Sequence, residues 1–167
     1  HGRFPDLQFV IPVASTLTDF DLQPQIDDSG LPVTLVHERV HDVIQACDAI
    51  VTVSGTVTME IALLGVPMVI IYKVAPLTYF IGTRLIRVDH IGICNIVLGE
   101  RVAPELTQHD AEPARVAAEL CRMLDDAGYA ENIRLKLKTV RSLLGESGAS
   151  QRVARLTIDL MEQGTLI

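Results

Sequence analysis

Small and hydroxylated residues interrupt an apolar run near the middle of the chain: Ser54, Gly55 and Thr56 follow residues 49–53 and precede a helical pattern. At a helix start, free backbone N–H groups and the helix dipole can bind an anion. Gly55 has no Cβ to keep a phosphate away, and the flanking hydroxyls can donate hydrogen bonds. The alternative is an ordinary helix N-cap, for which Ser and Thr are common.

A carboxylate follows one helical turn later, at Glu60. A capping box needs Glu three residues after the cap, whereas Thr56 and Glu60 are four apart and lie on one helix face. Glu60 would then point toward the same cleft and could accept two hydrogen bonds from a ribose diol; a favourable interaction with the helix dipole is the rival explanation. The pattern favours a nucleotide diphosphate. Neither GxxxxGK[ST] nor GxGxxG is present, which weakens an ATP or nicotinamide interpretation.

The elements that must position these residues alternate between strands and helices. Apolar runs predict strands at 7–14, 31–36, 49–53 and 67–72, and 92–99 is a fifth apolar segment. Asn95 within it looks exposed. Helical patterns cover 37–47, 56–65, 76–88, 112–126, 129–144 and 148–163, and residues 21–30 read as a short helix or loop. This alternation predicts an α/β fold, a Rossmann-like doubly wound parallel sheet.

Composition narrows the class of protein. The 167 residues suit one domain, 49% are hydrophobic and only 4% aromatic, which fits buried parallel strands. A net charge of -7 argues against general nucleic-acid binding. Three scattered cysteines without a CxxC pair indicate reduced thiols, and no histidines stand at metal-ligand spacing. The opening residues 1–8 read as a helix end running into a strand, so we expect a piece of a longer protein.

A long motif string carries a resemblance to a known family. The segments CDAIVTVSGTVTMEIALLGVPMVIIYKVAPLTYFIG (47–82) and HIGICNIVLGERVAPELTQ (90–108) resemble the lipid-A-disaccharide synthases. Cys47 stands where a small residue is expected. The resemblance runs over essentially the whole chain. It implies that residues 1–167 form the C-terminal, UDP-sugar-binding domain of a two-domain GT-B glycosyltransferase, with the first strand of that domain missing.

The resemblance also implies an activity. A hexosyltransferase of this family transfers diacylglucosamine from UDP-diacylglucosamine to diacylglucosamine 1-phosphate, releases UDP, and forms a β-1,6 link with inversion. It implies no cofactor and no bound metal. The expected location is the bacterial cytoplasm, peripheral on the inner face of the inner membrane. Because the N-terminal acceptor domain would be absent, the chain alone is expected to be inactive.

Matching the family motif assigns roles to individual residues. Ser54, Gly55 and Thr56 would approach the UDP diphosphate, and Glu60 would bind ribose. His37 lies in the loop expected to hold uracil but is equally well a plain loop residue. Asn95 matches an active-site Asn, with a structural hydrogen bond as the alternative. Glu100 and Arg101 would meet the donor sugar or phosphate, or are simply surface residues; Glu105 and Gln108 are weaker candidates.

A membrane contact is expected on the helical pattern 76–88. Apolar residues share one helix face there, while Arg84 falls within that face and Arg87 at its edge. An interfacial helix permits this arrangement because basic side chains reach lipid headgroups while apolar ones insert. The alternative is a core helix. The contact residues we expect are Phe80, Ile81, Arg84, Leu85 and Arg87.

Two other functions remain open from the sequence. A UDP-sugar 2-epimerase shares the two-domain plan and the Glu-bearing helix, but acts on soluble substrates and needs no apolar basic helix. A non-catalytic domain that binds a nucleotide or a partner chain is the second. A chain lacking one strand could also complete its sheet from another copy, as a homodimer with swapped elements.

Overall fold

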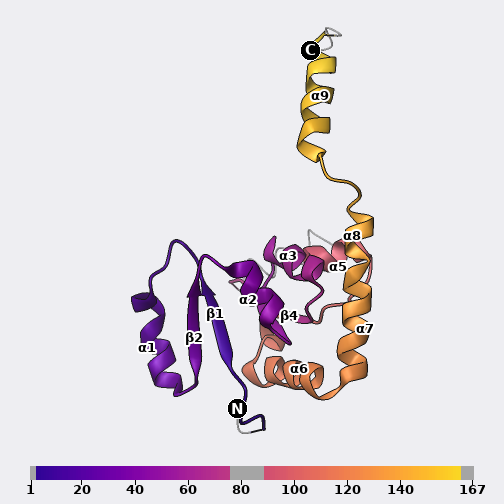
Figure 1. The fold of residues 1–167 in the computed structure, drawn as a ribbon. Helices are drawn as coiled ribbons and strands as arrows, with labels where there is room; N and C mark the ends of the chain where they lie inside the picture. The colour runs from indigo at the N-terminus through magenta and orange to yellow at the C-terminus, as the bar shows by residue number, and fades with distance from the viewer. Residues whose placement is uncertain (1–2, 76–88, 163–167) are drawn as a thin grey trace.

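The computed structural model describes residues 3–75 and 89–162, and within these ranges parallel strands alternate with helices (Figure 1). The first part of the chain forms β1 (Phe9–Val13), α1 (Asp19–Ser29), β2 (Val33–His37), α2 (Val40–Ala46), β3 (Ile50–Val53), α3 (Val57–Leu64) and β4 (Met68–Tyr72). The second part forms α5 (Ile93–Leu98), β5 (Glu105–Thr107), a 3-10 turn (Gln108–Asp110), α6 (Pro113–Asp125), α7 (Ala127–Lys138), α8 (Val140–Leu143) and α9 (Ala149–Glu162).

The strands form two small parallel sheets. One sheet pairs β1 with β2, and the other has the order β3-β4-β5. In Figure 1, α1, β2 and β1 lie together on one side of the body, and α6 and α7 lie on the other. The predicted α/β class with parallel strands is therefore confirmed. Neither β1 nor β3 has a second strand neighbour among the described residues, so the sheets stay separate there.

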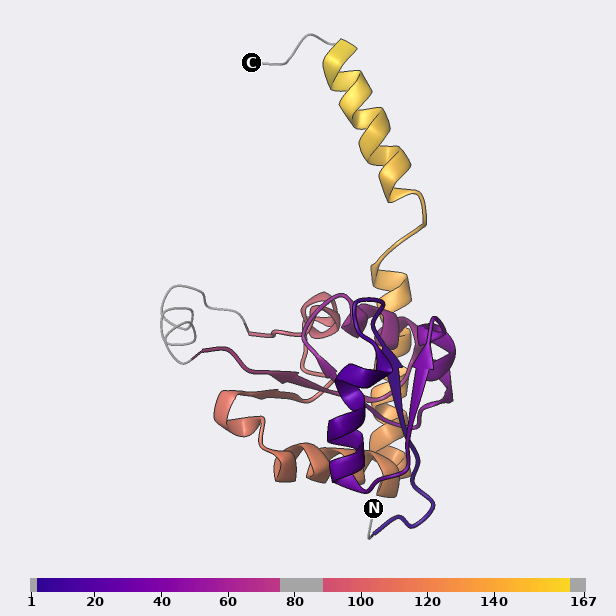
Figure 2. The same ribbon diagram turned by 90° about the vertical axis from the view of Figure 1, so that its left-hand side faces the viewer.

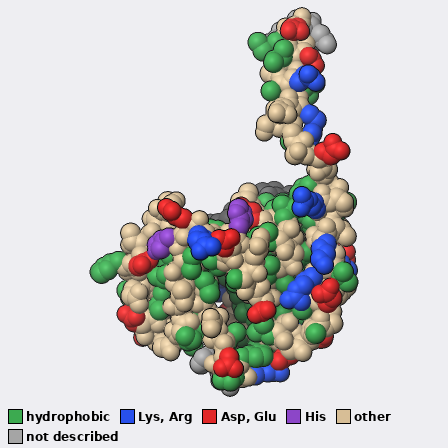
Figure 3. Space-filling model, viewed as in Figure 1, with side chains coloured by type: hydrophobic (Ala, Val, Ile, Leu, Met, Phe, Trp, Pro, Cys, Tyr) green, Lys and Arg blue, Asp and Glu red, His purple; other side chains and the backbone are tan. Residues whose placement is uncertain are grey.

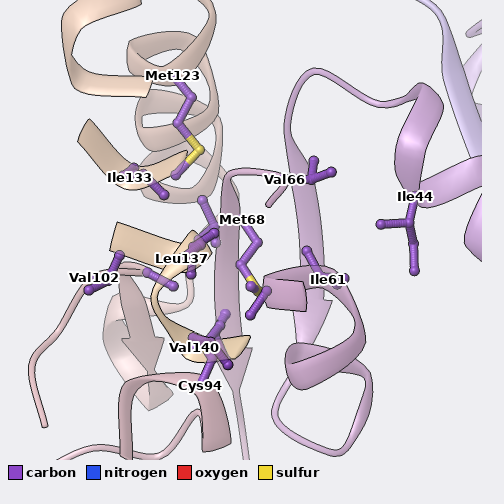
Figure 4. Close-up of a cluster of buried hydrophobic side chains, with 14 residues drawn as sticks. Ile44, Ile61, Val66, Met68, Cys94, Val102, Met123, Ile133, Leu137 and Val140 are labelled. Carbon is purple, nitrogen blue, oxygen red and sulfur yellow. The ribbon is translucent and has the colours of Figure 1, made fainter. Parts of the chain in front are cut away.

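The strand at the centre of the larger sheet is the core of the molecule. Met68, Val69 and Ile70 of β4 are at most 1% exposed because neighbouring strands cover both edges and helices cover both faces. A strand buried in this way is apolar without alternation, as 67–72 is. Figure 4 shows the cluster around it, to which α3, α5, α6, α7 and α8 contribute Ile61, Cys94, Met123, Ile133, Leu137 and Val140.

The region after β4 contains two elements that the sequence interpretation did not assign. The apolar segment 92–99 is the helix α5, which ends at Gly99 in the left-handed region. Strand β5 follows at Glu105–Thr107 and was not predicted, because three residues with two polar side chains carry no strand pattern. The helical pattern 76–88 lies outside the described residues. Within the described ranges, no helix is both long and apolar enough to cross a bilayer.

The last helix stands away from the rest of the molecule. In Figures 1 and 2, α9 projects from the body, and none of its residues is buried. The connection to it contains Gly145 and Gly148, both in the left-handed region. The helix exposes apolar side chains along its length: Val153, Leu156, Ile158, Leu160 and Met161.

Burial of Cys94 predicts a pH dependence of stability. Burial raises the pKa of this fully buried thiol to about 11. As pH rises past the ordinary value near 9, the thiol ionises first in the unfolded chain, so stability present below pH 9 is lost toward pH 11. Urea unfolding should be measured at pH 8 and pH 10.5. Between these values the free energy of unfolding should fall further in the wild type than in Cys94→Ala, by on the order of 2 kcal/mol. Parallel pH curves for the two proteins would contradict this.

Candidate functional site

The turn between β3 and α3 is held from two sides. The Ser54 hydroxyl donates to the Ile91 carbonyl at 2.8 Å, and the Ser54 N–H donates to the Ile71 carbonyl at 3.3 Å. Thr58, fully buried, donates its hydroxyl to the Gly55 carbonyl at 2.8 Å. The proton of the Ser54 hydroxyl is therefore already used within the chain, which leaves backbone N–H groups and Thr56 as the donors nearest to solvent.

Gly55 is not required by the fold of the described residues. A Cβ built on it would meet no heavy atom within 4 Å, and its φ lies outside the left-handed region. Thr56 is exposed and its side chain makes no capping hydrogen bond at the start of α3. Within residues 3–75 and 89–162, no atom thus covers the surface in front of Gly55. Glycine here suits the close approach of something other than the chain itself.

Glu60 lies on the first turn of α3 and faces a second loop. Its carboxylate is 3.4 Å from Nε2 of His41, and the two side chains are 45% and 70% exposed. Because His41 belongs to α2, this contact brings the loop after β2 next to the helix that follows the Ser54 turn. The sequence interpretation missed His41, because nothing in the sequence distinguishes a single exposed histidine from an ordinary surface residue.

The last residue of β2 and the loop after it carry their own polar pairs. His37 lies 2.7 Å from the Asp19 carboxylate at the start of α1, and Arg39 lies 2.8 Å from Asp42. Between them, Glu38 has a φ of 59°, an uncommon conformation for a residue with a side chain. Figure 3 shows histidine and basic side chains interleaved with acidic ones along the upper edge of this face.

Asn95 is fully buried, so its exposed appearance in the sequence was misleading. Its Oδ1 accepts from the N–H groups of Val102 and Ala103 at 3.0 Å. Its Nδ2 donates to the Ala103 carbonyl and to Glu105, both at 2.8 Å. These four hydrogen bonds, with a longer contact from Cys94 Sγ to Oδ1, keep the amide bonded inside the protein, which is the structural alternative to a ligand contact. A ligand would have to replace one of these bonds.

The contacts of Glu100 and Arg101 are with α7 and a cavity beside it. Glu100 forms an ion pair with Lys136 of α7. Arg101 borders a cavity of about 330 Å³ whose wall also includes Glu105, Glu119, Tyr129 and Asn132. No residue of the Ser54 turn lines this cavity. The remaining predicted contacts, Phe80, Ile81, Arg84, Leu85 and Arg87, lie outside the described residues. In the described ranges, no three His, Cys, Asp or Glu side chains converge as metal ligands would.

Comparison with known proteins agrees on one family. A family model described as lipid-A-disaccharide synthetase matches residues 1–157. Relatives named lipid-A-disaccharide synthase are 62% identical in Geobacter sulfurreducens and 58% in Geobacter metallireducens, each over 95% of this chain. A relative of the same name in Nitrosococcus oceani is 45% identical over 97% of this chain.

The aligned part is a minority of each relative. The chain spans 41% of the length of both Geobacter proteins and 42% of the Nitrosococcus protein. The family match nevertheless covers nearly every residue described above, including the Ser54 turn, Glu60 and Asn95. On this match and these identities, the chain belongs to the lipid-A-disaccharide synthase family.

Proposed function

We propose that this chain is the UDP-sugar-binding domain of a lipid-A-disaccharide synthase. The whole enzyme would transfer diacylglucosamine from UDP-diacylglucosamine to diacylglucosamine 1-phosphate, with inversion, a β-1,6 link and release of UDP. The family membership supports the reaction class. The observation that carries the binding role is the open turn at Gly55, where no part of the described chain needs a glycine.

The turn and α3 would each bind a different part of the nucleotide. The N–H groups of Gly55, Thr56 and Val57, with the Thr56 hydroxyl, would donate to the diphosphate, because the N–H groups of Thr58 and Met59 already donate to the Gly55 and Thr56 carbonyls. Glu60 would accept from the ribose hydroxyls, and the ribose would take the place now held by His41. The backbone of the loop after β2, at His37, would contact uracil.

The other matched residues would act less directly. Asn95 would position the site from inside the protein, because its amide is already fully hydrogen-bonded. Glu100 and Arg101 would reach the sugar or phosphate from the loop after α5, where Glu100 pairs with Lys136 and Arg101 borders the cavity. The rest of the relatives' length would supply the acceptor site and the catalytic groups.

Substitution of Gly55 tests the binding role separately from stability. Gly55→Ala should fold with an unchanged or higher melting temperature, because an Ala at a compatible position stabilises by about 0.4–1 kcal/mol. It should weaken UDP binding by roughly tenfold, since the new methyl group occupies the open space where the phosphate approaches. Isothermal titration of UDP and a thermal melt on the same samples measure both.

The ribose role has a matched control. Glu60→Ala should weaken UDP by roughly tenfold, the loss of a charged hydrogen-bond acceptor. Glu131→Ala removes an equal charge from an exposed pair on α7 and should leave the affinity unchanged. UDP binding that is insensitive to Glu60→Ala would remove the ribose role, and absence of UDP binding in the wild type would favour the non-catalytic alternative.

We propose further that α9 packs on a second copy, as a swapped element of a homodimer. Val153, Leu156 and Leu160 share one face at helical spacing, and each is at least 45% exposed. A helix with such a face needs a partner to be stable in water. The glycine-containing connection before α9 would let the helix reach across.

Light scattering after gel filtration tests the exchange of α9. The wild type should have twice the mass of one chain, and Leu156→Glu should shift it to a single chain because a carboxylate enters the apolar contact. Arg155→Glu, on the opposite face of α9, should stay dimeric. A wild type that elutes as a single chain at all concentrations would exclude the dimer.

Peripheral attachment to the inner face of the bacterial inner membrane completes the proposal, with acylated substrates met at the lipid surface. Phe80→Asp should reduce flotation with vesicles of anionic phospholipid by about tenfold, since a charge would replace an inserting ring. Tyr79→Asp, on the opposite face of the predicted helix, is the control. Equal flotation of wild type and Phe80→Asp would overturn the interfacial role of residues 76–88.

A further inference from the structure

We propose that Glu105 is a positioning residue for the Ser54 turn, which it holds through the backbone of Ile91. The consequence for UDP rests on the proposed function, whereas the contact between Glu105 and the turn stands on geometry alone. Glu105 belongs to the unpredicted strand β5 and is 9% exposed.

The Glu105 carboxylate accepts hydrogen bonds from the segment before α5 and from one side chain of α5. It accepts from Ile91 N at 3.0 and 3.1 Å, from Gly92 N at 2.8 Å and from Asn95 Nδ2 at 2.8 Å. These are hydrogen bonds to an acceptor-only group, of the strong, charge-assisted kind when the carboxylate is ionised. An amide of the same shape would turn an NH₂ group toward some of these donors.

Ile91 joins this network to the turn. Its N–H is bound by Glu105, and its carbonyl accepts the Ser54 hydroxyl at 2.8 Å. One residue therefore connects the start of β5 to the turn that follows β3, across the strand β4 that lies between them. Fixing Ile91 fixes the position of the Ser54 side chain and hence the first N–H groups of the turn.

The segment has little room to settle elsewhere. A Cβ at Gly92 would lie 2.3 Å from Ile70 Cδ1 and 3.2 Å from Glu105 Oε1, so the backbone is pressed onto β4. Glu105 also accepts from the side-chain amide of Asn95. The Oδ1 atom of that amide accepts from the backbone N–H groups of Val102 and Ala103. Hydrogen bonds thus run from Asn95 to Glu105, from Glu105 to Ile91 and from Ile91 to Ser54. Through this series the buried Asn95 has a positioning role without contact with a ligand.

Gln108 provides the matched control. It stands three residues after Glu105 and exchanges two hydrogen bonds with the backbone of Val74, at 2.9 and 3.0 Å. Gln108 thus ties the same part of the chain to a different segment, and among the described residues no hydrogen bond joins Val74 to Ser54. Loss of its bonds should act independently of Ser54.

A double-mutant cycle in the full polypeptide tests the coupling. We expect Ser54→Ala to weaken UDP about fivefold and Glu105→Gln about tenfold, the scale of one or two lost hydrogen bonds. The double variant should stay near tenfold, because both changes release the same Ile91 link. In the control cycle of Gln108→Met with Ser54→Ala, the double variant should weaken UDP binding by the product of the two single effects. A double Ser54/Glu105 variant weakened by the full product, about fiftyfold, would overturn the proposal.

Amide hydrogen exchange separates this proposal from the UDP role. Without ligand, Glu105→Gln should speed exchange in peptides covering 54–58 and 89–95 by about tenfold and leave α7 unchanged. Unchanged exchange at 54–58 would refute the positioning role even if UDP binds. Faster exchange there, in a wild type that binds no UDP, would refute the proposed function alone. If Glu105→Gln fails to fold, Ser54→Ala must speed exchange at 89–95, and failure to do so refutes the link.

Discussion

The burial of β4 is the constraint on which the rest of the structure depends. Met68, Val69 and Ile70 are almost inaccessible, and helices from distant parts of the sequence pack around them. A parallel strand can be buried in this way only if neighbours satisfy its backbone on both edges. The three residues of β5 supply one of those edges. So short a strand contributes little apolar surface, and side-chain hydrogen bonds from Glu105 and Gln108 hold the segments around it.

The candidate site depends on the same arrangement. Ser54 follows the strand on one edge of β4, while Glu105 stands in the strand on the other. Their connection through Ile91 crosses the end of the buried strand. The open space in front of Gly55 therefore rests on a rigid base, as a site for a phosphate requires. His41 and Glu60 add a second contact, between α2 and α3, on the exposed side of that base.

Much of the fold could be predicted from the sequence. The apolar runs at 49–53 and 67–72 and the glycine at 65 define β3, β4 and the end of α3. Strand β5 could not be predicted, because Glu105 and Thr107 give it no apolar pattern and its pairing with β4 is a long-range contact. The burial of Asn95 could not be predicted for a related reason: an amide among apolar residues is compatible with a cleft or with buried partners, and its partners Val102, Ala103 and Glu105 are brought to it by the fold. The contacts of Glu100 and Arg101 likewise depend on where α7 packs.

The cavity beside Arg101 has one wall in common with the network that holds the turn. Glu105 lines that cavity and also accepts the Ile91 and Gly92 N–H groups. Glu105 therefore belongs both to the wall of the cavity and to the hydrogen-bond network of the Ser54 turn. A substitution of Glu105 would therefore change the wall of the cavity and the anchor of the Ser54 turn together.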